Sequence, residues 1–168
     1  MATQEKIGIR PLKTVSGNPP ELRTYPEAAT QTYKKGELVY LVSGKVTEFT
    51  DAVDDGTVRV LGIAAVDASG TTDTDAPVWI FNDDTIFVGT VDHTTAASAV
   101  TAVADVSNLW PFKYDTTNSR VTIDKEDTAS QLDACRIVGI YLPAGHTLGD
   151  IYGQLEFVVE AAARVLRR

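Results

Sequence analysis

The residue types most often used in catalysis are scarce in this chain. Its two histidines, His93 and His146, lie in polar segments, and neither has a histidine or cysteine partner at metal-ligand spacing. Asp92 precedes His93, but a surface turn explains that pair more simply than an acid–base dyad. The one cysteine, Cys135, stands in the apolar run ACRIVGIYL, which is typical of a buried thiol. No P-loop, dinucleotide fingerprint or nucleophile elbow occurs, so we expect no enzyme and no cofactor.

Carboxylates form the second group of residues that could do chemistry. They cluster in four segments, and oxygen-rich loops can bind calcium. The segment DASGTTDTD, residues 67–75, has part of the required spacing but lacks the glutamate that closes an EF-hand loop. Asp favours turns, and an acidic surface keeps a protein soluble. We therefore expect turns rather than a metal site, with ion binding as the alternative.

The aromatic residues could bind a ligand or build a core. Trp79 with Phe81, and Phe112 with Tyr114, are each spaced by two, which places each pair on one face of a strand. This spacing favours core packing. A row of exposed aromatic rings that binds carbohydrate, through Trp79 or Trp110, is the alternative.

Charge is distributed unevenly along the 168 residues, whose net charge is −8. Residues 1–35 carry +3, residues 161–168 carry +3, and the intervening residues 36–160 carry −14. An acidic body would repel phosphates, so we expect no nucleic-acid partner. The basic ends either contact an acidic surface or are simply solvated.

The sequence also bears on the compartment. No run of about 18 apolar residues exists, so we expect no membrane-spanning segment and no membrane partner. The first residues, MATQEKIGIRPLK, lack the apolar region of a secretory signal. A single cysteine cannot form an intrachain disulfide, which favours synthesis in a reducing compartment.

Residues 1–35 read differently from the rest of the chain. They hold four of the seven prolines, and no helical or strand period is sustained there. Apolar residues nevertheless recur, which a solvated linker would not need. We interpret residues 1–35 as an extended N-terminal arm that docks on something else; a loosely held terminus is the alternative.

Residues 36–160 read as a β-rich body. Four hairpins are predicted, with turns at Ser43–Gly44, at NDD (82–84), at TTNS (116–119) and within PAGHTLG (143–149). A helix of about ten residues is predicted after Thr94 or Thr95. Short strands at regular spacing indicate a mainly β fold, a small barrel or sandwich with one short helix. Residues 161–168 are expected to form a basic C-terminal tail, either a last helical turn or loose.

The pattern of the body resembles a known family. The hairpin pattern Y-x-x-G-x-x-V-Y-L is present, a G-I-A strand follows it, and a short predicted helix precedes a later hairpin; the matching residues are Tyr33, Gly36, Val39, Tyr40, Leu41, Gly62, Ile63 and Ala64. With the extended segment before it, this arrangement resembles the capsid decoration (cement) proteins of tailed bacteriophages. The resemblance covers roughly residues 24–160.

The resemblance implies a structural virion protein with a small β-tulip-like body. Such a protein is made in the bacterial host cytoplasm and binds the exterior of the phage head, where it stabilises the lattice of the major capsid protein. It would be a homotrimer whose arm braces neighbouring subunits. From the composition of the arm, we expect these residues to contact the capsid: Ile7, Ile9, Arg10, Leu12, Leu22, Arg23 and Tyr25.

Three other readings stay open. The chain could be another virion part, such as a head fibre or a tail protein. It could be a carbohydrate- or protein-binding β module. It could also be an enzyme that uses carboxylates far apart in the sequence.

Overall fold

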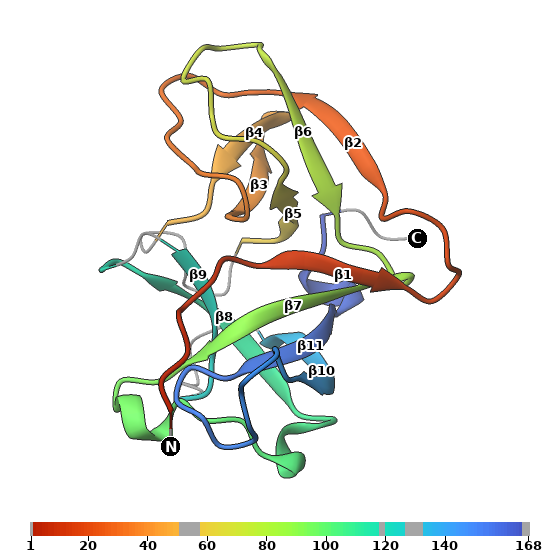
Figure 1. The fold of residues 1–168 in the computed structure, drawn as a ribbon. Helices are drawn as coiled ribbons and strands as arrows, with labels where there is room; N and C mark the ends of the chain where they lie inside the picture. Colours follow the sequence, from red (N-terminus) through yellow and green to blue (C-terminus); the bar gives the residue numbers. More distant parts are fainter. Residues whose placement is uncertain (1, 51–57, 118–119, 127–132, 166–168) are drawn as a thin grey trace.

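The computed structural model describes residues 2–50, 58–117, 120–126 and 133–165, and these fold into two β-sheets (Figure 1). The six-stranded sheet has the order β1-β7-β11-β10-β8-β9, with bounds Arg10–Thr14, Thr85–Asp92, Gln154–Val159, Asp133–Tyr141, Leu109–Asp115 and Arg120–Asp124. The five-stranded sheet has the order β2-β6-β5-β3-β4, with bounds Leu22–Pro26, Asp75–Ile80, Val60–Ala64, Leu38–Val42 and Lys45–Glu48. The chain is therefore mainly β, as the sequence predicts.

Each sheet curls until strands far apart in its order meet. In the six-stranded sheet, β7 pairs in parallel with β9 through Val91 and Ile123, which joins the two ends of the series β7-β11-β10-β8-β9. In the five-stranded sheet, Glu27 at the end of β2 bridges to Val46 in β4. Curling of this kind hides edge hydrogen-bonding groups and encloses a core.

The larger core lies between the sheets and inside the six-stranded one. Four phenylalanine rings pack with centroids 4.8 to 6.1 Å apart; they are Phe81, Phe87, Phe112 and Phe157. The predicted core role of the aromatic pairs is confirmed: Phe81 and Phe112 are buried, and their partners Trp79 and Tyr114 are half-buried and pack against the same core. Trp110, the other candidate for carbohydrate binding, is buried as well. Cys135 is buried in the same core, as its apolar surroundings predict.

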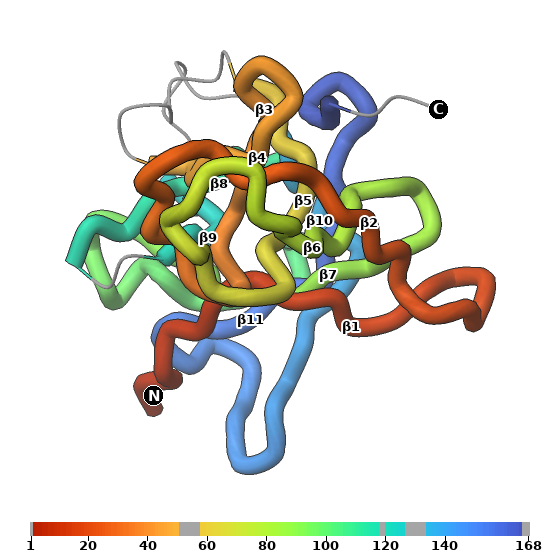
Figure 2. The backbone as a smooth tube through the Cα atoms, turned by 90° about the horizontal axis from the view of Figure 1, so that it is seen from above, coloured from red at the N-terminus to blue at the C-terminus, as the bar shows by residue number. Residues whose placement is uncertain are grey.

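The segment expected to be an arm is paired with both sheets of its own chain. β1 pairs with β7, from Arg10 opposite Val88 to Thr14 opposite Thr85, and β2 pairs with β6 (Figure 2). Both are the terminal strands of their sheets, as Figure 1 shows. Pro11 and Pro26 lie in these strands, and an edge strand tolerates proline because one row of its amides is not needed for pairing. The prolines therefore mark edges, not an unpaired arm.

Three of the four predicted hairpins are confirmed and one is wrong. β3 pairs with β4, β8 with β9, and β10 with β11. The NDD turn instead carries the chain from β6 in one sheet to β7 in the other. The turn itself forms, because the Asn82 side chain accepts hydrogen bonds from the amides of Asp84 and Thr85 at 3.1 and 2.8 Å. Local turn chemistry does not decide which strands pair.

The predicted helix after Thr95 is also wrong. Two short turns of 3-10 helix occur there, Ala96–Ser98 and Val103–Asp105. Between them Val100 bridges to Ile151, which requires an extended backbone. β-branched residues in this stretch lower helix propensity, and the Thr95 side chain makes no capping hydrogen bond.

The described part of the C-terminal tail packs against the body instead of reaching outward. Ala161–Ala163 form a turn of 3-10 helix, and the amide of Val165 donates to the Val60 carbonyl at 2.9 Å. The Arg164 side chain is buried and lies 2.5 Å from the Asp83 carboxylate. A carboxylate therefore neutralises this basic residue within the chain. The other two tail arginines, Arg167 and Arg168, lie outside the described residues.

A buried carboxylate stabilises the region where β2 meets β4 in the five-stranded sheet. Glu27 accepts hydrogen bonds from the Tyr33 hydroxyl at 3.0 Å and from the amides of Ser69 and Gly70 at 2.9 and 2.6 Å. Burial opposes ionisation, but the hydrogen bonds from Ser69, Tyr33 and Gly70 outweigh it and lower the pKa of Glu27. Glu27 therefore stays ionised and holds the 67–73 loop against the sheet.

Replacing Ile9 tests whether the N-terminal segment is part of the body. Ile9 is 0% exposed, whereas Val15, a few residues later, is 74% exposed. Ile9→Ala should lower the free energy of unfolding by about 3 kcal/mol, because a buried side chain leaves a cavity. Val15→Ala is the matched control and should change it by less than about 0.5 kcal/mol. Urea denaturation measures both, and equal effects would show that residues 1–35 do not pack as described.

Replacing Glu27 tests the carboxylate closure. Glu27→Gln should lower the free energy of unfolding at pH 7 by about 1–3 kcal/mol, because an amide nitrogen would face hydrogen-bond donors. The folded-state pKa lies below the unfolded-state value of about 4.3, so this stabilisation exists above that value and disappears as pH falls through the folded pKa. The gap between the wild type and the variant should therefore narrow in acid. Urea denaturation from pH 7 downward measures the gap, with exposed Glu5→Gln as the control; a gap independent of pH would contradict the assignment.

Candidate functional site

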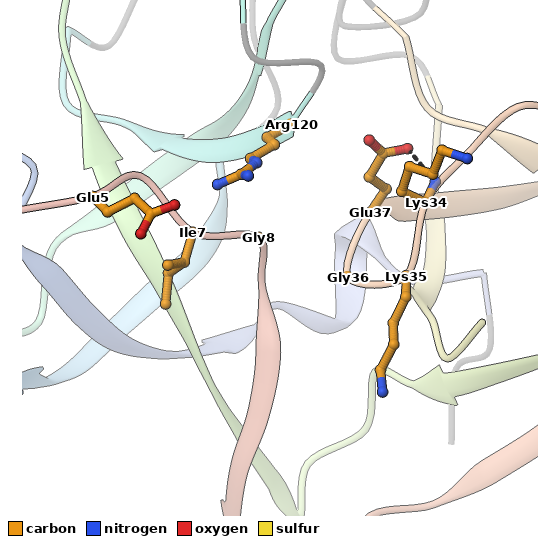
Figure 3. Close-up of a pocket in the computed structure, with 8 residues that line it drawn as sticks. All are labelled: Glu5, Ile7, Gly8, Lys34, Lys35, Gly36, Glu37 and Arg120. Carbon is orange, nitrogen blue, oxygen red and sulfur yellow. Dashed lines mark hydrogen bonds between the residues drawn. The ribbon is translucent and has the colours of Figure 1, made fainter. Parts of the chain in front are cut away.

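A groove runs along the seam between the two sheets (Figure 3). It consists of two adjoining hollows of about 430 and 540 Å³ that share Ile7, Gly8, Lys35 and Gly36. We call it the seam groove and define it by its lining residues: Glu5, Ile7, Gly8, Ile9, Arg10, Pro11, Lys34, Lys35, Gly36, Glu37, Trp79 and Arg120. One wall is the N-terminal segment leading into β1, and the other is the loop before β3.

Two glycines allow these walls to approach each other. A Cβ atom on Gly8 would lie 3.1 Å from the Gly36 carbonyl oxygen, which is closer than ordinary van der Waals contact. Gly36 has a φ of +91°, in the region where side chains are disfavoured. The Gly36 amide donates to the Ala64 carbonyl at 2.9 Å, which anchors the loop to β5. The floor of the groove is therefore bare backbone.

The N-terminal wall is held in place from behind. The Ile7 amide donates to the Thr90 hydroxyl at 3.0 Å, and the Arg120 guanidinium donates to the Lys6 carbonyl. The Ile9 side chain points into the core, so Ile9 supports the wall from inside. This wall is preformed and does not depend on a partner for its shape.

An ion cluster lies next to the groove and fixes the start of the chain. The Lys6 ammonium lies 3.0 Å from Asp92 and 2.8 Å from Asp115, and 4.5 Å from the centre of the Tyr152 ring. Burial acts to lower the pKa of Lys6, but the two carboxylates outweigh it and raise the pKa. Lys6 is therefore a charged structural anchor between β7 and β8.

The groove is rich in cations although the chain is acidic. Lys34 pairs with Asp67 at 3.4 Å. The Arg10 guanidinium lies 5.4 Å from the Tyr141 ring centre, and the Lys35 ammonium lies 5.7 Å from the Trp79 ring centre. Among the residues that the structure describes, neither of these two forms an ion pair.

Glu37 is a nearly buried carboxylate in the lining of the groove. It is 9% exposed, and one of its carboxylate oxygens accepts a hydrogen bond from the Lys34 amide at 2.8 Å. Burial raises the pKa of Glu37 and outweighs that hydrogen bond. Figure 3 shows its carboxylate turned toward Lys34, so Glu37 supports the loop through this hydrogen bond.

The structure separates the seven predicted contact residues into two groups. Ile7, Ile9 and Arg10 line the groove, and the Ile9 side chain is fully buried in the core of its own chain. The other four lie on β1 and β2: Leu12 is half-buried, Leu22 is 54% exposed, Arg23 pairs with Glu21, and Tyr25 packs on the smaller core.

Most residues of the groove were not singled out as contacts by the sequence, and three of them are central to its charge and shape. Lys35, Trp79 and Arg120 come from three separate regions of the chain. The pair Lys34–Lys35 before a glycine is a weak local signal for an exposed basic loop. Nothing near Arg120 in sequence indicates that it reaches the N-terminal segment.

The residues considered for catalysis remain apart. The His93 ring nitrogen accepts a hydrogen bond from the Thr95 amide at 2.9 Å, and His146 lies 3.4 Å from Asp150. Asp150 accepts hydrogen bonds from the amides of Thr147 and Ala2, which lower its pKa to about 2. Among the described residues, no three His, Cys, Asp or Glu side chains are arranged to hold a metal ion. Asp51, Asp54, Asp55 and Asp127 of the carboxylate clusters lie outside the described residues.

Comparison with known proteins gives no relative. No family model, curated protein or solved structure matches this chain. None of the helices in the described ranges has the length and apolar character needed to cross a membrane.

Tryptophan quenching tests the accessibility and charge of the groove. Trp110→Phe leaves Trp79 as the only tryptophan, and Trp79→Phe leaves the buried Trp110, which is 7% exposed. Trp79 should be quenched several-fold more by iodide than Trp110. It should also be quenched more by iodide than by caesium, because Lys35 and Arg10 attract anions. Equal quenching by the two ions would contradict a cationic groove.

Proposed function

We propose that this chain is a structural virion protein that binds the outer surface of a phage head and stabilises the lattice of the major capsid protein. The observation that carries the proposal is the seam groove, in which Ile7 and Arg10, two of the predicted contacts, lie beside Trp79 on one surface. The mainly β fold and the resemblance of residues 24–160 to decoration proteins support it.

The packing of the N-terminal segment changes how such a protein would act. An extended arm would lose conformational entropy on docking, whereas a preformed groove has lost it already on folding. The chain would then brace neighbouring capsid subunits as a rigid body that contacts both of them. In a homotrimer, three grooves would act together and increase the overall affinity without strong single contacts.

A carbohydrate-binding module is the second candidate, and the position of Trp79 favours it. Trp79 is half-buried and lines the more apolar hollow, where a sugar ring could stack. The Lys35 ammonium over the Trp79 ring competes for that stacking face. Glycan-array binding that is lost in Trp79→Ala would favour this candidate over the capsid role.

Labelling of intact particles tests the virion proposal. Phage heads are purified from a lysate of the cells that produce this chain. Gold-labelled antibodies against the chain should label the outside of these heads, because the protein is proposed to bind the outer surface. Electron microscopy gives the position of the label, and antibody preabsorbed with the pure chain is the control.

The position of the label separates the readings. Label on tails or fibres would favour another virion part. Absence of label on particles, with the chain detected only in the soluble fraction, would overturn a structural virion role.

A further inference from the structure

We propose that the seam groove binds an extended acidic peptide segment of a partner protein. Its carboxylates would pair with Arg10 and Lys35, and an apolar side chain between them would lie against Ile7, Pro11 and Trp79. This inference rests on the proposed function only in taking the capsid protein as the partner; the chemistry of the groove is argued independently below.

Unmatched positive charge is the first argument. The whole chain has a net charge of −8, yet four cationic residues line the groove, Arg10, Lys34, Lys35 and Arg120, against two carboxylates, Glu5 and Glu37. Lys34 pairs with Asp67, and Arg120 donates to the Lys6 carbonyl. Within the described ranges the charged groups of the Arg10 and Lys35 side chains have only aromatic rings as partners. Carboxylates from a partner would form an ion pair with each of these two side chains, and charge complementarity of this kind gives specificity.

The shape of the groove is the second argument. Its larger hollow, about 540 Å³, is lined mainly by apolar side chains and by the bare backbone of Gly8 and Gly36. These glycines let the two walls of the groove meet, so that backbone and not side chains forms its floor. Beside this hollow, β1 is the terminal strand of its sheet. Pro11 removes one donor from this edge, so a peptide in the hollow would be held by side-chain contacts and not by strand pairing.

The negative charge of the chain favours a short peptide over a nucleic acid as the ligand of the groove. Single-stranded nucleic acid also combines negative charge with rings that stack on aromatic side chains. However, residues 36–160 carry −14, which would repel a long run of phosphates. A short peptide can place two carboxylates at Arg10 and Lys35 without continuing across the acidic surface.

The test uses a fluorescent peptide of alternating glutamate and leucine, and a matched peptide in which lysine replaces glutamate. Anisotropy should show saturable binding of the glutamate peptide only, weakened by salt because screening reduces charge attraction. Arg10→Glu and Lys35→Glu should each weaken binding about tenfold or more, since each reverses a charge beside a carboxylate. Arg59→Glu makes the same change at an exposed position outside the groove lining and should leave binding unchanged.

Three further readouts keep the result independent of folding. Thermal unfolding of each variant should match the wild type, because Arg10 and Lys35 are exposed. Lys35→Gln removes the charge without reversing it and should give a smaller loss of affinity than Lys35→Glu. In the Trp110→Phe background, the glutamate peptide should change the emission of Trp79.

Several outcomes would overturn the inference. Equal binding of the two peptides, no binding of the glutamate peptide, or equal effects of Arg59→Glu and Lys35→Glu would each do so. Tighter binding of oligothymidylate than of the glutamate peptide would assign the groove to nucleic acid. Labelled heads with no peptide binding would remove this inference alone, whereas peptide binding without labelled heads would remove the virion role alone.

Discussion

The attachment of the first 26 residues to both sheets is the constraint on which the rest of the structure depends. β1 completes one sheet, β2 completes the other, and Ile9 fills the core between them. The same segment supplies one wall of the seam groove, while the loop that follows it supplies the other. Because the walls belong to two sheets packed on one core, the groove keeps its width only while the sheets stay packed.

Carboxylates serve this architecture mainly as acceptors inside the chain. Glu27 holds a loop, Asp92 and Asp115 hold Lys6, and Asp105 accepts from Lys125 and the Ala102 amide. Members of the acidic clusters, which the sequence assigns to turns with ion binding as the alternative, do the same: Asp67 accepts from the Lys35 amide and Asp84 from the Ser16 amide. The charged groups of Arg10 and Lys35, which line the groove, form no ion pair with a carboxylate in the described ranges.

The sequence predicted what local chemistry decides. The turn at Ser43–Gly44 specified the β3–β4 hairpin because both residues adopt positive φ there. Local sequence could not predict that β6 and β7 belong to different sheets, because their sheet depends on partners such as β2 and β11 elsewhere in the chain. The same contrast between local and long-range information applies to the residues of the groove. Arg10 could be proposed from the basic, apolar character of its segment, but Trp79 and Arg120 meet it only through folding.

The long-range pairing of β1 has a consequence for how the chain folds as it is synthesised. Its partner residues in β7, such as Val88 opposite Arg10, are made much later. During synthesis β1 therefore stays unpaired and exposed to solvent until β7 has left the ribosome. Pairing across such separations slows folding, because the entropy of closing a long loop is lost before the contacts form. The two prolines of β1 and β2 would limit mispairing of those waiting strands with other chains.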